Sequence, residues 1–129
     1  MDVLLSIKPE FVKEIFSFNK LYVYRKSIFK RPVERVYIYS SLPVQLVVGH
    51  FRFNTVLSDS VDEIWRLTRL HSGISEEYYY KYFHGHERAF AIPICHLIEY
   101  PNPLPLSAFR IKYAPQSFCY IPEFSFFDI

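Results

Sequence analysis

The sequence predicts an α+β fold in which about five to six short strands form a small mixed or antiparallel β-barrel with flanking helices. Half of the 129 residues are hydrophobic, which provides a core for a single domain over residues 1–129. Short stretches rich in β-branched and aromatic residues follow one another with few helical segments between them, so a doubly wound parallel sheet is disfavoured. The chain has only three Gly and no Gly-rich phosphate loop, which excludes P-loop and dinucleotide folds.

The first half of the chain predicts four strands and one helix. The strands are expected over residues 3–7, 20–25, 36–39 and 45–53. The helix begins at Pro9, where the missing N–H costs nothing, and continues to Phe16 with apolar residues at helical spacing. Gly49 in the fourth strand indicates a bulge or a close approach of another part of the chain.

The second half predicts two helices followed by two strands. Ser58, Asp59 and Ser60 offer N-caps for a helix over residues 61–70, and Gly73 is a helix stop. The second helix runs from Ser75 through Phe83. A fifth strand is expected over residues 89–98, then a connection punctuated by three prolines, and residues 115–121 predict a turn followed by a short strand.

A basic and aromatic stretch, Lys20-Leu21-Tyr22-Val23-Tyr24-Arg25-Lys26, is the strongest functional signal. Strand alternation places Tyr22, Tyr24 and Lys26 on one face and the apolar residues on the other. Cations beside flat rings suit the stacking of a base and the binding of a phosphate. The alternative is a half-exposed strand whose polar groups contact solvent. The net charge of +2 does not suggest general coating of a nucleic acid, but Lys and Arg cluster between residues 20 and 35.

The order of several short motifs resembles the ASCH domain of the PUA-like superfamily. The motifs are Ser6-Ile7-Lys8-Pro9, Lys20 with Arg25-Lys26, Val36-Tyr37-Ile38-Tyr39-Ser40-Ser41, Tyr82-Phe83-His84-Gly85 and Pro115-Gln116-Ser117-Phe118, which extend across nearly the whole chain. The resemblance implies a small β-barrel with a cleft that holds RNA, a modified base or a nucleotide. The characteristic positions of the family fall on Ser6, Lys8, Lys20, Arg25, Lys26 and Ser40.

Two residues depart from the pattern of the family and bear on catalysis. Phe18 stands where a Gly is expected, and Val23 stands where an acid or a hydroxyl is expected. Some ASCH proteins resemble amidohydrolases that remove an acetyl group from a cytosine derivative with a Lys and a Thr of this strand. Lys20 matches that Lys, but Val23 has no nucleophilic oxygen, which favours binding over this hydrolysis. Resemblance to ribonucleases implies charge stabilisation by Lys and Arg, with His84 or His86 as the acid–base partner.

We therefore expect an RNA-binding or modified-nucleotide-binding site without catalytic residues. Lys8, Lys20, Arg25 and Lys26 would hold phosphate or base edges, while Tyr22 or Tyr24 and a tyrosine of the second predicted helix would stack. The complete expected site is Ser6, Lys8, Lys20, Tyr22, Tyr24, Arg25, Lys26, Ser40, Tyr82, His84, Gln116 and Ser117. Two alternatives stay open: a hydrolase that acts in the same cleft, and a regulatory module that binds a protein partner, such as a DNA-binding subunit, or a second copy of itself.

No metal site, cofactor or membrane contact is expected. The pair His84 and His86 has no third ligand nearby except Glu87, which disfavours zinc. Cys95 and Cys119 lie in apolar runs and match no metal spacing, so they predict buried free thiols. No apolar run approaches the roughly 20 residues that span a bilayer, and no signal peptide is recognisable, so we expect a cytoplasmic protein.

Overall fold

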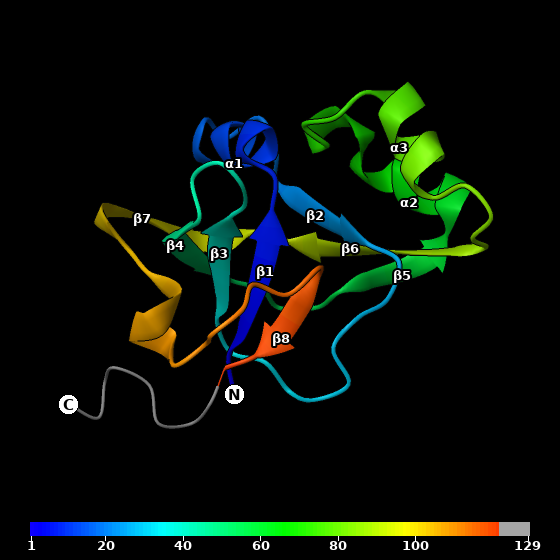
Figure 1. Cartoon of the computed structure of the whole chain (residues 1–129). Helices are drawn as coiled ribbons and strands as arrows, with labels where there is room; N and C mark the ends of the chain where they lie inside the picture. The colour runs from blue at the N-terminus through cyan, green and yellow to red at the C-terminus, as the bar shows by residue number, and fades with distance from the viewer. Residues whose placement is uncertain (122–129) are drawn as a thin grey trace.

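The computed structural model describes residues 1–121, which form two β-sheets with helices at one end and one side (Figure 1). The larger sheet has the strand order β7-β4-β3-β1-β8, and the smaller has the order β2-β6-β5. The strands are β1 Val3–Ile7, β2 Tyr22–Arg25, β3 Val36–Ser40, β4 Leu46–Arg52, β5 Leu57–Ser60, β6 Arg88–Pro93, β7 Cys95–Leu104 and β8 Phe118–Tyr120. The α+β class is as predicted. The ladders within residues 1–121 leave both sheets open, so closure into a barrel stays a prediction.

The helices are α1 Pro9–Phe16, α2 Val61–Thr68 and α3 Glu76–Tyr82. Two short 3-10 helices are also present: η1 Arg69–His71 lies between α2 and α3, and η2 Leu106–Phe109 lies between β7 and β8. Figure 1 shows α2 and α3 together beside the smaller sheet, and α1 at the end of the strands of the larger sheet. In the described part of the chain, no helix is both long enough and apolar enough to cross a membrane.

Strand β1 organises the larger sheet because it pairs with two strands that are distant in sequence. It pairs in parallel with β3, where Ile7 faces Ser40, and antiparallel with β8, where Leu5 faces Phe118. The other ladders of the described residues are antiparallel, which confirms the predicted mixed sheet. The carboxyl end of β1 therefore lies next to the start of β8.

Strand β2 lies between two hydrophobic cores. Val23 packs with residues of the larger sheet, whereas Tyr24 packs with Ile64, Trp65 and Tyr79 of α2 and α3. The alternative of a half-exposed strand is therefore wrong for Tyr24, which is only 4% exposed. Helices α2 and α3 cover that face of β2. The alternation of side chains along a strand does not indicate whether a helix packs on either face.

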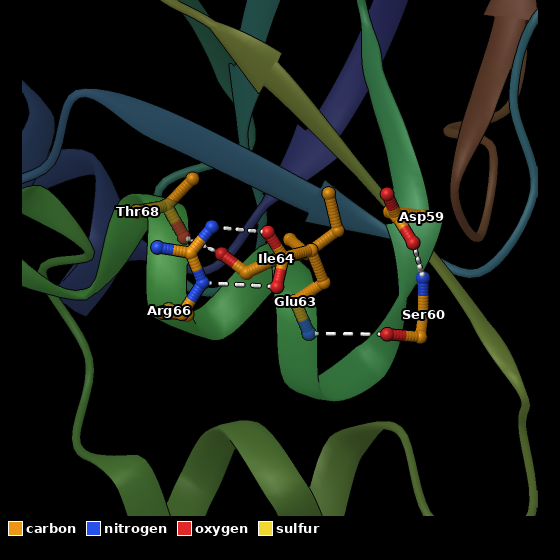
Figure 2. A network of polar contacts seen from close by, with 6 residues as sticks. All are labelled: Asp59, Ser60, Glu63, Ile64, Arg66 and Thr68. Carbon is orange, nitrogen blue, oxygen red and sulfur yellow. Dashed lines mark hydrogen bonds and ion pairs between the residues drawn. The ribbon is translucent and has the colours of Figure 1, made fainter.

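The start of α2 is capped as predicted. The Ser60 Oγ accepts a hydrogen bond from the backbone N–H of Glu63 at 3.1 Å, as Figure 2 shows. Glu63 and Arg66 form an ion pair on the outer side of the helix. At the other end, Thr68 donates to the carbonyl oxygen of Ile64 at 2.6 Å, and its Oγ1 also lies 2.7 Å from the hydroxyl of Tyr24. This contact joins α2 to β2.

Three predicted elements have different bounds in the structure. The single strand expected over residues 89–98 is two strands, with β6 ending at Pro93 and β7 beginning at Cys95. The proline-rich segment belongs to β7, because this strand lies at the sheet edge, where a residue without an N–H is tolerated. The helix expected over residues 61–70 changes to η1 after Thr68. Strand β5 was missed because three of its four residues are polar.

Gly49 lies where the fold leaves no room for a side chain. A Cβ at this position would overlap the carbonyl oxygen of Ile98 and lie 2.9 Å from the ring of Phe16. The pairing register of β4 shifts beside it, between Val47 and Gly49. The predicted bulge and close approach are both confirmed, and they allow α1 and β7 to pack against β4 at the same point.

The hydroxyl pair of Tyr24 and Thr68 gives a test of how α2 is attached to β2. We expect Thr68→Val to lower the free energy of unfolding by about 1–3 kcal/mol, because the buried Tyr24 hydroxyl loses its partner. The double variant Thr68→Val/Tyr24→Phe should lose less free energy of unfolding than the two single variants lose together. Urea unfolding of the four proteins measures this coupling, and strictly additive losses would contradict it.

A basic and aromatic candidate binding cavity

A cavity of about 550 Å³ lies among β1, β2, α1, α3, the loop after β3 and the segment before β8. Its aromatic side chains are Phe11, Tyr24, Tyr39, Tyr78 and Tyr82, and its cationic side chains are Lys8, Lys20 and Arg25. None of the residues that line it carries a carboxylate. The cavity therefore combines flat rings with cations that form no ion pair among residues 1–121.

The structure brings most of the predicted site residues to this cavity. Those that line it are Ser6, Lys8, Lys20, Tyr24, Arg25, Tyr82, Gln116 and Ser117.

Four predicted site residues do not line the cavity. Ser40 is buried at the end of β3, so the next residue, Ser41, lines the cavity in its place. Tyr22 packs against the core of α2 and α3, and His84 is exposed beyond the end of α3. Lys26 is exposed, with its Nζ 4.5 Å from the ring centroid of Tyr82.

Lys20 is a buried amine rather than a solvent-facing cation. It precedes β2 and forms an isolated bridge with Ser72, whose carbonyl oxygen accepts a hydrogen bond from Nζ at 2.8 Å. The Nζ lies 4.7 Å from the ring centroid of Tyr24 and 5.6 Å from that of Phe11. Burial, and then the charge of Arg25, lower the pKa of Lys20 from 10.5 to about 7. Lys20 therefore loses its proton far more readily than an exposed lysine does.

Gly73 makes room for Lys20. Its φ of +66° lies in the left-handed region, and a Cβ there would overlap the side-chain stem of Lys20. The sequence predicted Gly73 as a helix stop, and the structure places it just after η1. The glycine thus ends the helical segment and also lets the Lys20 stem pass.

Arg25 is held by backbone carbonyl groups and keeps donors for a ligand. Its Nη1 donates to the carbonyl oxygen of Tyr24 at 2.8 Å, and its Nη2 donates to that of Ser6 at 2.9 Å. Its Nε is buried without a hydrogen-bond partner. Burial lowers the pKa of the guanidinium, and the neighbouring Tyr82 opposes that shift. A guanidinium has five N–H groups, so the two Nη groups each keep a second N–H beyond these carbonyl contacts, which Tyr82 and an anion can share.

Ser6 holds the segment of residues 114–117, here called the roof segment, over the cavity. Its backbone N–H donates to the Ser117 carbonyl oxygen at 2.9 Å, and its Oγ donates to that of Pro115 at 2.6 Å. Its own carbonyl oxygen accepts from Arg25. The sequence predicted Ser6 as a ligand contact, but its only hydroxyl proton is used within the protein. Ser6 therefore positions both the roof segment and Arg25.

Several cavity residues were not predicted individually. Phe11 and Tyr78 form an edge-to-face pair with ring centroids 5.2 Å apart, and Lys8 donates to the Tyr78 hydroxyl at 3.3 Å. The i, i+4 spacing of Tyr78 and Tyr82 is a signal that could have selected these two from the tyrosine-rich helix. Leu42 and Gln45 come from the loop after β3, for which the sequence contains no comparable signal.

Sequence comparison finds partial similarity to several proteins, and no protein-family model matches the chain. A stretch covering 92% of this chain is 32% identical to part of ATP synthase subunit alpha of Ureaplasma parvum, and 28% identical to part of the large ribosomal subunit protein uL22 of the same species. An ASCH domain-containing ribonuclease of Zymomonas mobilis is 31% identical over 70% of this chain. The chain spans only 15%, 39% and 62% of these three relatives.

Comparison of folds finds the ASCH protein of Zymomonas mobilis. Its crystal structure matches with a TM-score of 0.84 and 26% sequence identity, over 95% of this chain and 88% of that one. The crystal structure of a variant of that protein, with a tyrosine replaced by phenylalanine, matches with a TM-score of 0.85 and 24% identity over 95% and 91% of the two chains. The fold described above is thus the fold of these structures.

The lowered pKa of Lys20 predicts a pH dependence of stability. Between pH 7 and 9.5 the unfolded chain keeps Lys20 protonated, whereas the folded chain releases the proton. The unfolded state then binds more protons, so the free energy of unfolding should rise with pH, by at most about 1.4 kcal/mol per pH unit. Urea unfolding of the ligand-free protein at pH 7, 8 and 9 measures this rise.

The matched variants for this measurement are Lys20→Met and Lys13→Met. Lys13 is exposed on α1 and does not line the cavity, so its variant should keep the rise. Lys20→Met should remove it. An equal rise in both variants would mean that another group causes it.

Proposed function

The chain is an ASCH domain, and on this basis we propose that its cavity binds a base and its phosphate, either within RNA or in a modified nucleotide. One observation carries the proposal: three cationic and five aromatic side chains surround the cavity without a carboxylate among them. A base is a flat ring that stacks on aromatic side chains, and the attached phosphate is an anion that offsets buried positive charge. A volume of about 550 Å³ is typical of sites for small organic ligands.

The charges of the cavity favour an anion over a neutral ligand. Arg25 offers a planar set of donors that matches phosphate oxygens, and the Nζ of Lys20 lies deeper in the protein. A bound phosphate raises the pKa of Lys20 again, because an opposite charge favours the protonated amine. Binding of a phosphate should therefore take up a proton near neutral pH. Gln45 and Gln116 supply amides that donate to and accept from the edge of a base.

A second candidate function is cleavage of RNA in the same cavity. The relative from Zymomonas mobilis is named a ribonuclease. For this chain, one feature favours the same chemistry: Lys20, with a pKa of about 7, is suited to moving a proton at neutral pH. The histidines expected for this role, His84 and His86, do not line the cavity. In this candidate function Lys20 is the acid–base group and Arg25 stabilises charge on the phosphate.

Binding tests the first proposal. Lys20→Met and Arg25→Met should each weaken binding of adenosine monophosphate, and of a single-stranded RNA of about 12 nucleotides, by roughly 10- to 100-fold. The reason is the loss of a charge-assisted hydrogen bond from a buried cation. Calorimetry measures the affinity for the nucleotide, and fluorescence anisotropy measures the affinity for the RNA. Lys13→Met is the control, and its affinities should equal those of the unchanged protein. If the unchanged protein binds neither ligand, the proposal is wrong.

Cleavage is tested by comparing Lys20→Arg with His84→Ala on a labelled RNA. The arginine keeps a positive charge but cannot release its proton near pH 7, so binding should persist while cleavage stops. His84→Ala should cleave at the unchanged rate, and the rate of the unchanged protein should vary with pH around 7. Loss of cleavage in His84→Ala with full activity in Lys20→Arg would assign the chemistry to the histidine instead.

A further inference from the structure

A basic loop leads away from the cavity along the edge strand β8. It consists of residues 26–31, Lys26-Ser27-Ile28-Phe29-Lys30-Arg31, and contains no acidic residue. At its start, the Nζ of Lys26 lies over the ring of Tyr82, which lines the cavity. The loop therefore begins at the cavity itself.

The second half of the loop, residues 29–31, is held against β8 by several contacts. The ring of Phe29 packs on that of Phe118, the first residue of β8, with centroids 5.1 Å apart. Further on, the backbone N–H groups of Lys30 and Arg31 donate to the hydroxyl of Tyr120, the last residue of the strand, at 2.9 and 3.3 Å. The guanidinium of Arg31 lies 5.0 Å from the ring centroid of Tyr120. The loop thus runs beside β8 in a defined position (Figure 1).

Three cations of this loop are exposed and have no carboxylate partner within the described residues 1–121. Lys26, Lys30 and Arg31 are all exposed. Among residues 1–121, none of them forms an ion pair. Ser117 lines the cavity and directly precedes β8, so Tyr120 lies roughly 10 Å beyond it at the ordinary rise of a strand. Lys30 and Arg31 consequently lie too far out to share the phosphate of a single nucleotide held by Lys20 and Arg25.

We infer that residues 26–31 and β8 form a phosphate track for a single-stranded RNA whose base occupies the cavity. The inference rests on the proposed function and specifies its ligand as a polynucleotide rather than a free nucleotide. One nucleotide enters the cavity, and the phosphates that follow it in the strand contact Lys26 and then Lys30 and Arg31. Such contacts are independent of base sequence and weaken with salt as bound counterions are released.

The test uses the double variant Lys30→Gln/Arg31→Gln. Its affinity for adenosine monophosphate should be unchanged, because the cavity is intact. Its affinity for a single-stranded RNA of about 12 nucleotides should fall about tenfold at low salt, with a slope of log affinity against log salt that is smaller by about 1.4, since two phosphate contacts are lost. The matched control is Arg69→Gln/Arg88→Gln, which removes the same charge from exposed positions outside the cavity and the loop.

The outcomes separate the two proposals. If the unchanged protein binds neither the nucleotide nor the RNA, the proposed function itself fails. If Lys20→Met and Arg25→Met weaken RNA binding but Lys30→Gln/Arg31→Gln does not, the cavity proposal stands and the track is wrong. An equal loss in the Arg69→Gln/Arg88→Gln control also overturns the track. Because the guanidinium of Arg31 lies over the ring of Tyr120, thermal unfolding of the double variant checks that its fold is intact. The single variant Lys30→Gln keeps this contact and should show half of the change in the salt slope.

Discussion

The burial of two neighbouring cations among aromatic rings is the constraint on which the rest of this site depends. An unpaired charge is costly to remove from water, and within residues 1–121 neither Lys20 nor Arg25 forms an ion pair. Backbone carbonyl groups and aromatic rings hold both cations, and the charge of Glu14 acts on Lys20 without direct contact. The carbonyl groups belong to Ser6, Tyr24 and Ser72, which come from three separate parts of the chain. The folded chain therefore fixes both cations in place, and a site of this kind is arranged before any ligand arrives.

Small features of the sequence acquire their meaning from this constraint. Gly73 lacks a side chain because the stem of Lys20 passes there, and Ser6 is a serine because its hydroxyl proton is needed by the carbonyl group of Pro115. Neither residue has to touch a ligand to matter for binding. The aromatic rings serve two purposes at once, since Tyr24 and Phe11 face the amine of Lys20 and also line the cavity.

How far the sequence predicted the structure depended on the range of the interactions involved. The Ser60 cap and the Gly49 bulge were predicted correctly, because cap chemistry and backbone crowding leave local traces. The α+β class and the mixed sheet followed from the order of elements. The burial of Lys20 and Tyr24 could not be predicted, because helices more than 30 residues away in the chain cover them. The exchange of Ser40 for Ser41 and the position of His84 outside the cavity depend on where an element ends, which sequence patterns locate poorly.

The position of the roof segment determines when, during synthesis of the chain, the cavity can be completed. The bond between Ser6 and Pro115 joins residues 109 positions apart, so a chain synthesised from its N-terminus can make it only after synthesis has passed Pro115. Until then, Lys20 and Arg25 can assemble with α1 and β2, but the cavity stays open on one side and β8 is missing from the sheet edge. An unfinished chain therefore has the cations of the cavity without the roof segment and β8, which complete the shape of the cavity and the edge of the sheet.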